Sequence, residues 1–76
     1  MRLDPAKLRR ARERKVLSMR EVSRLSGVAN DGIIAYERGE QEPRPSTVRK
    51  LAAALGVEPA DLMADDDAAG DEEERG

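Results

Sequence analysis

Apolar side chains recur along the chain at helical spacing, in short segments bounded by proline and glycine. The clearest series is an unbroken i, i+3, i+4, i+7 pattern made by Val48, Leu51, Ala52 and Leu55. Pro45 suits the first turn of such a helix, and Gly56 follows its last residue. A first helix is predicted from the Asp4-Pro5 start to about Lys15, with one face made by Leu8, Ala11, Arg12 and Lys15.

Two more helices are predicted between these. Ser18 followed by Glu21 has the spacing of a capping box, so a second helix begins there and ends at Gly27. Its inner face is Met19, Val22, Ser23 and Ser26, where the small serines permit a close helix contact. A third helix spans about residues 30–38 and stops at Gly39, with Ile33 and Tyr36 on its inner face.

The last ordered element is a turn that starts at Glu58-Pro59 and buries Leu62. After Met63 only Ala, Gly, Asp, Glu and Arg occur, a composition that cannot bury enough apolar area to offset the entropy of ordering. No strand pattern is visible. We therefore predict an all-α domain of five helices over residues 4–63 and a disordered acidic tail over residues 64–76.

Composition narrows the possible chemistry. The chain of 76 residues has no Cys, no His and one aromatic residue, so the usual ligands of zinc and haem and the usual nucleophiles and bases are missing. The clustered carboxylates lie in the predicted tail, where no catalytic geometry can be held. We expect no enzyme activity, metal or cofactor. No apolar run is long enough to span a membrane and no signal peptide is evident, so a cytoplasmic protein is expected.

The net charge of −2 conceals two opposite parts. Residues 1–62 carry 13 basic and 9 acidic residues, a net of +4, whereas residues 63–76 carry one basic and seven acidic residues, a net of −6. Within the basic part, residues 1–24 alone carry nine basic and three acidic residues, a net of +6. This asymmetry fits a domain that faces a polyanion. It fits equally a solvated helical surface with a tail that confers solubility.

Residues 19–38 combine a helix, a glycine turn and a second helix, the arrangement that DNA-reading helix-turn-helix proteins use. Here the chain resembles the Cro/repressor (XRE) family, and further matching pieces are Leu8 to Arg12, Leu17-Ser18, Glu37-Arg38-Gly39, Pro43 and Leu51 to Val57. The resemblance implies a lambda-repressor-like bundle. It also implies a transcriptional regulator, commonly a repressor, that binds double-stranded DNA as a homodimer on a palindromic operator, with residues 30–38 in the major groove.

The same resemblance implies an ion pair between Arg12 and Glu37. Arg12 lies on the apolar stripe of the first helix, where an unpaired guanidinium is costly. The pair would tie that helix to the third helix. The alternative is an exposed Arg12 whose aliphatic stem lies along the surface.

Four residues of the third helix are predicted to face outward and to read bases: Asn30, Asp31, Ile34 and Ala35. Asn30 offers the donor and acceptor that suit adenine, Asp31 can accept from cytosine, and Ile34 can touch a thymine methyl. Instead of touching thymine, Ile34 could contact a partner protein or simply be exposed to solvent. Ala29 stands where the family usually has a capping serine, so Asn30 is a second candidate for the cap.

Phosphate contacts are assigned to Ser18, Met19, Arg20, Arg24, Arg38 and Arg44. Ser18 is also a candidate helix cap, and Met19 stands where the family commonly has a glutamine. Three further arginines face away from the core and either contact phosphate or form a solvated surface: Arg9, Arg10 and Arg14. Residues 29–42 carry one basic and four acidic residues, a net of −3. The alternative function is therefore a helix-turn-helix scaffold used mainly for protein contact.

Overall fold

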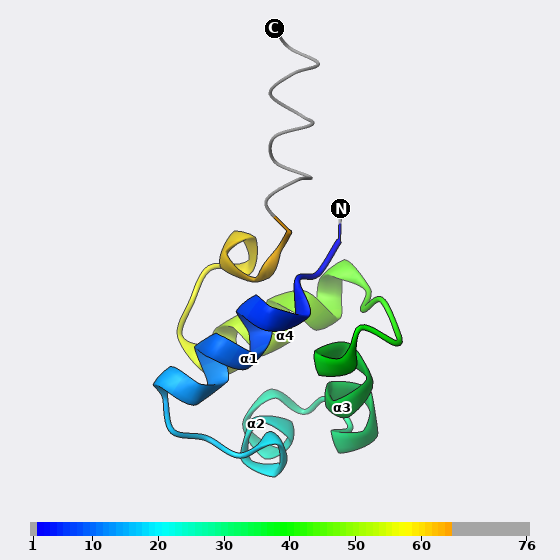
Figure 1. Cartoon of the computed structure of the whole chain (residues 1–76). Helices are drawn as coiled ribbons and strands as arrows, with labels where there is room; N and C mark the ends of the chain where they lie inside the picture. Colours follow the sequence, from blue (N-terminus) through cyan, green and yellow to red (C-terminus); the bar gives the residue numbers. More distant parts are fainter. Residues whose placement is uncertain (1, 65–76) are drawn as a thin grey trace, which may run out of the picture.

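The computed structural model describes residues 2–64, and four α-helices and one 3-10 turn follow one another along them (Figure 1). The helices are α1 (Pro5–Arg14), α2 (Met19–Ser26), α3 (Asn30–Arg38) and α4 (Pro45–Leu55), and the 3-10 turn is η1 (Pro59–Leu62). The all-α prediction is confirmed for this part of the chain. The predicted fifth helix is a single 3-10 turn of four residues, because the backbone is already extended at Met63. The predicted disordered tail lies outside the described residues, apart from Ala64.

The helix boundaries follow from local signals that the sequence contains. The carboxylate of Asp4 accepts the N–H of Ala6, and Pro5 occupies the first turn of α1. Left-handed glycines end the other helices, with φ of 78° at Gly27, 73° at Gly39 and 69° at Gly56.

The end of α1 departs from this rule. Val16 takes a φ of 56° although it is β-branched, and the residue is 86% exposed. Its N–H donates to the carbonyl of Glu13, and the N–H of Leu17 donates to that of Arg12, the pair of bonds that closes a Schellman motif. Glycine is the usual residue at this position, so Val16 is strained there.

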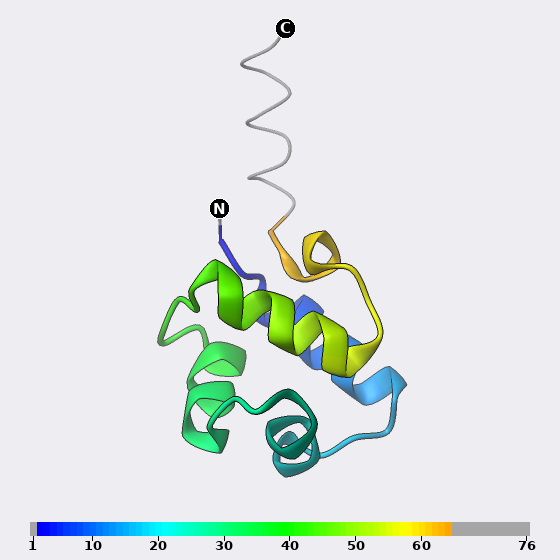
Figure 2. The ribbon, with the colours of Figure 1, turned by 180° about the vertical axis from the view of Figure 1, so that it is seen from behind.

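The core is built from small aliphatic side chains of every element. The predicted inner residues Leu8, Val22, Ile33, Leu51 and Leu55 are fully buried. Around them α4 packs on α2 and η1, and α3 packs on α1 and α2 (Figures 1 and 2). None of the helices within residues 2–64 is long and apolar enough to cross a membrane.

The two ends of the described chain meet, which the sequence did not indicate. Leu3 is buried and forms an antiparallel bridge with Met63. The N–H of Asp4 donates to the carbonyl of Leu62 over 2.9 Å, and the N–H of Ala64 donates to the carbonyl of Arg2 over 2.8 Å. The ordered unit thus begins before Asp4, and Ala64, assigned by prediction to the tail, takes part in it.

Candidate nucleic-acid interface

The turn between α2 and α3 is held by the side chains of two serines. The hydroxyl of Ser23 donates to the carbonyl of Val28 over 2.6 Å, and the hydroxyl oxygen of Ser26 accepts the N–H of Val28 over 3.1 Å. Gly27 supplies the left-handed residue, and nothing lies within 4 Å of where its Cβ would be, so only its backbone conformation requires glycine. These bonds fix the direction in which α3 leaves α2.

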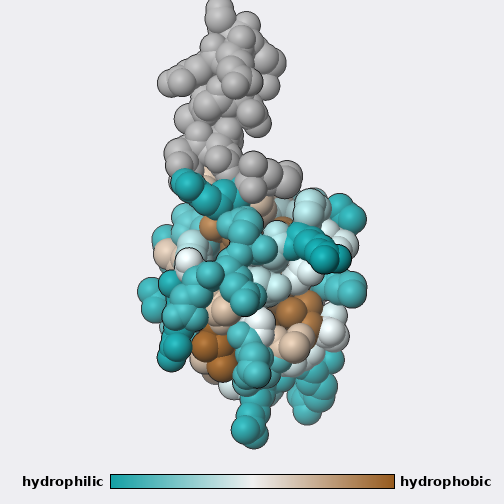
Figure 3. All heavy atoms as spheres, turned by 90° about the vertical axis from the view of Figure 1, so that its right-hand side faces the viewer, coloured by the Kyte–Doolittle hydropathy of each residue, from teal (hydrophilic) through white to brown (hydrophobic). Residues whose placement is uncertain are grey.

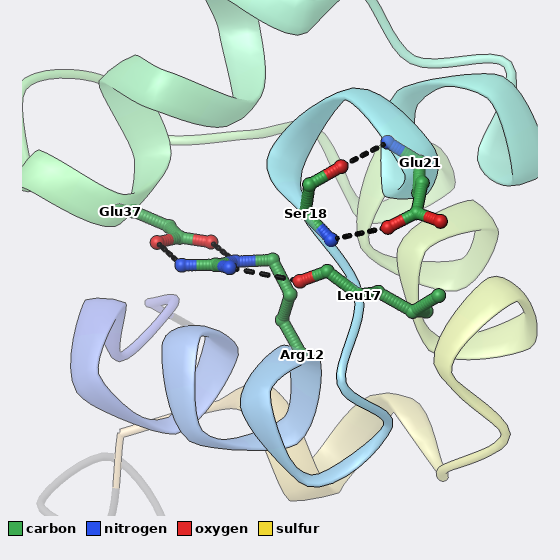
Figure 4. A network of polar contacts seen from close by, with 5 residues as sticks. All are labelled: Arg12, Leu17, Ser18, Glu21 and Glu37. Atoms are coloured by element: carbon green, nitrogen blue, oxygen red, sulfur yellow. Dashed lines mark hydrogen bonds and ion pairs between the residues drawn. The ribbon is translucent and has the colours of Figure 1, made fainter.

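The N-terminus of α2 carries the predicted capping box. The Ser18 Oγ accepts the N–H of Glu21 over 3.1 Å, and the N–H of Ser18 donates to Glu21 Oε1 over 2.7 Å (Figure 4). The backbone hydrogen bond from Ser18, and next its hydroxyl, lower the pKa of the Glu21 carboxyl. Ser18 therefore caps α2 through both its hydroxyl and its backbone N–H.

Arg12 joins three segments of the chain. Its Nε lies 2.6 Å from Glu37 Oε2 and its Nη2 lies 3.0 Å from Glu37 Oε1, so the two planar groups pair through two bonds (Figure 4). Its Nη1 donates to the carbonyl of Leu17 over 2.9 Å, just ahead of α2. The hydrogen bonds to Glu37 raise the pKa of the Arg12 guanidinium.

This arrangement fixes α3 relative to α1. The side chains of Arg12 and Glu37 are only 15% and 7% exposed, so the snorkelling alternative for Arg12 does not describe the structure. Because Glu37 belongs to α3 and Leu17 leads into α2, one guanidinium holds both helices of the helix-turn-helix against α1.

The four residues predicted to read bases are not equally exposed. Asp31 is exposed, whereas Asn30, Ile34 and Ala35 are half-buried. The Oδ1 atom of Asn30 is buried and has no hydrogen-bond partner among the described residues. Partial burial of these three residues leaves their base-reading role a prediction, and the structure adds that the Oδ1 of Asn30 is covered.

The start of α3 has no side-chain cap. Ala29 is the N-cap residue and makes no capping bond, and Asn30 is already inside the helix. The idea that Asn30 replaces the missing serine is therefore wrong. The first helical bond is donated by Ile33 to Ala29, which leaves the N–H groups of the first turn directed out of the helix end.

The candidate phosphate-contacting residues lie at the start of α2 and along it, at the end of α3 and at the start of α4. Arg20 and Arg24 are exposed one turn apart on α2, Arg38 is exposed at the end of α3, and Arg44 is exposed as the N-cap residue of α4. Met19 differs from them, because its side chain packs against the core and only its backbone N–H is left to contact a ligand. The sequence did not reveal the exposed Leu25 on α2, which is 56% accessible.

Two carboxylates near α3 are engaged within the protein. Glu37 pairs with Arg12, and Glu42 Oε2 accepts the N–H of Leu3 over 2.7 Å. With the paired Glu37 left out, the net charge of residues 29–42 changes from −3 to −2.

The surface on this side of the molecule is mainly hydrophilic, with small separate apolar areas (Figure 3).

The arrangement matches known proteins. The model of the helix-turn-helix family HTH_3 matches residues 8–62. A transcriptional repressor of the cryptic phage CTXphi, RstR from Vibrio cholerae, is 40% identical over 60 residues, which are 79% of this chain and 54% of that protein. The transcriptional repressor RghR from Bacillus subtilis is 39% identical over 57 residues, or 74% of this chain and 42% of the relative.

A solved structure shares the fold over nearly its whole length. The restriction-modification controller protein C.AhdI from Aeromonas hydrophila superposes with a TM-score of 0.75 and 34% identity, over 78% of this chain and 89% of that one. The chain spans about half the length, or less, of the curated relatives that it matches. Since the family model covers residues 8–62, the chain belongs to the helix-turn-helix family HTH_3, of the Cro/repressor (XRE) type.

Proposed function

We propose that this domain is a transcriptional regulator that binds double-stranded DNA sequence-specifically, with α3 in the major groove. The observation that carries the proposal is the fixed pair α2 and α3, held by Ser23, Gly27 and the Arg12–Glu37 ion pair. Recognition by a helix in a groove requires such rigidity, because a misplaced helix loses its base contacts. Two relatives named as transcriptional repressors support the same function.

The proposed base-reading residues are Asp31, Ile34 and Ala35, together with Asn30. For Asn30 to contact adenine, its side chain must rotate so that the Oδ1, now buried without a partner, becomes accessible. A buried acceptor without a partner is costly, so this rotation exchanges an unfavourable site for two hydrogen bonds.

The proposed phosphate contacts come from Arg20, Arg24, Arg38 and Arg44, from the Ser18 hydroxyl and from the backbone N–H of Met19. Arg20 and Arg24 lie on one face of α2, and the helix N-terminus adds the field of its free N–H groups. These contacts give affinity without sequence preference.

We further propose that residues 4–63 form the DNA-binding unit and that two copies bind a palindromic operator. Half-sites then lie one helical turn apart, about 34 Å, or a multiple of it. We propose no enzyme activity and no cofactor for this unit.

The test is selection of bound sequences from a random duplex pool at moderate salt. Enriched palindromes support the proposal. In the enriched site Asn30→Ala should lose about 1–3 kcal/mol and flatten the preference at one base pair of each half-site. Arg20→Ala and Arg24→Ala should weaken all sequences alike and each lower the salt slope by about 1.

Arg9→Ala is the matched control, because Arg9 is exposed on α1 and has no part in the proposed contacts. No enrichment of any duplex, together with an intact fold, would contradict the proposal. That outcome would favour the alternative of a scaffold for protein contact, for which the exposed Leu25 on α2 is the first candidate residue.

A further inference from the structure

A second basic surface lies on α1, away from α3. Lys7, Arg10 and Arg14 follow one another at i, i+3 and i+7, so they form a single stripe along the helix. With Ala11, Val57 and Asp61 they line a groove of about 330 Å³ between α1 and η1. In Figures 1 and 2, η1 and α3 lie on different sides of α1.

The groove carries excess positive charge. Apart from Lys7, which already donates to the carbonyl of Met63, Arg10 and Arg14 line it against one carboxylate, that of Asp61, whose Oδ2 accepts the N–H of Glu58 over 3.0 Å. Within residues 2–64, Arg10 and Arg14 have no ion pair. Two guanidinium groups one turn apart repel each other, so an anionic partner lowers the energy of this surface.

The described chain ends beside this groove. The Nζ of Lys7 donates to the carbonyl of Met63 over 3.0 Å, and Ala64 is held by Arg2. The twelve residues that follow, 65–76, carry seven carboxylates and one arginine, a net of −6. An extended chain advances about 3.3 Å per residue, so a few residues suffice to reach Arg10 and Arg14 from Ala64.

We propose that the acidic segment 65–76 of the same chain binds in the groove of Lys7, Arg10 and Arg14. Its carboxylates pair with the α1 guanidinium groups, and the apolar floor of Ala11 and Val57 accepts the small Ala68 and Ala69. The segment then covers α1 and leaves the α2–α3 surface free. If the domain binds DNA as proposed, the bound segment also keeps the α1 cations from non-specific phosphate contacts.

The test uses the full chain and its lack of cysteine. Ala69→Cys adds a single attachment point for a nitroxide spin label without altering any charge. Relaxation enhancement of the backbone amide signals should be strongest at Arg10, Arg14, Val57 and Asp61 at low salt. At about 1 M salt, where screening acts within about 3 Å, most of this enhancement should be lost.

The double variant Arg10→Gln/Arg14→Gln should lose most of the enhancement at α1, whereas Arg9→Gln, the same change on the same helix outside the groove, should retain it. Both variants alter exposed side chains, and their amide spectra report whether the fold is intact. Enhancement centred on Arg20 and Arg24, or spread evenly over the domain, would overturn the proposal. A mixed sample of spin-labelled protein and protein without the label gives the second control. Relaxation enhancement in the copies without the label would also overturn the proposal, because the segment would then bind a second copy.

Discussion

Arg12 and Glu37 face each other through two hydrogen bonds, of 2.6 and 3.0 Å, across the contact between α1 and α3. We expect Arg12→Ala and Glu37→Ala each to lower the free energy of unfolding by about 3 kcal/mol, because each leaves the other charge poorly solvated. The double variant should cost much less than the sum of the two. Urea unfolding of the four proteins measures the coupling, and additive losses would show that the pair contributes no interaction energy.

Replacement of Val16 by glycine should stabilise the domain. Val16 adopts a φ of 56° and is almost fully exposed, so the change removes strain and sacrifices little buried area. We expect a gain of about 1 kcal/mol, which raises the melting temperature by about 4–8 °C in a domain of this size. Val16→Ala keeps a Cβ in the left-handed region and should gain clearly less, and an equal gain for both variants would rule out backbone strain as the cause.

A serine at position 29 should cap α3. Ala29 makes no capping bond, and Ser at this position can accept an N–H of the first turn. Ala29→Ser should raise the free energy of unfolding by about 1 kcal/mol, and Ser18→Ala, which removes the cap of α2, should lower it by a similar amount. Thermal unfolding followed by circular dichroism compares the two, and no gain from Ala29→Ser would mean that the hydroxyl does not reach the helix end.

The capping box of α2 should weaken in acid. The pKa of Glu21 is lowered in the folded state, so its contribution to stability is present above the ordinary carboxyl pKa and is lost as the pH falls through the folded value. Carboxyl carbon NMR titration should give a pKa for Glu21 below its ordinary 4.5. In Ser18→Ala the value should rise only part of the way, since the backbone N–H remains, and an unshifted wild-type pKa would contradict the bond.

The helices were predictable because their signals are local. Val48, Leu51, Ala52 and Leu55 are buried as their spacing indicated, and the capping box at Ser18 and the left-handed Gly27 mark the ends of α2. Periodicity and caps depend on neighbours within a few residues, which the sequence presents directly.

The remaining features depend on contacts between distant segments or on backbone strain. Leu3 is buried through a partner sixty residues away, and Glu42 is engaged by its N–H, so no local pattern marks either residue. Val16 occupies a position where glycine would have marked the turn. For Asn30, a helical wheel indicates the face of the helix but not that the side-chain Oδ1 is buried.

The pairing of Leu3 with Met63 makes the two ends of the domain a single unit of local opening. The amides of Asp4 and Ala64 donate in opposite directions across one short bridge, so we expect their hydrogen exchange to be coupled. Because Leu3 also donates to Glu42, opening of this unit releases the loop that follows α3. We therefore expect that opening of this bridge also increases the mobility of the segment around Glu42, two residues before Arg44.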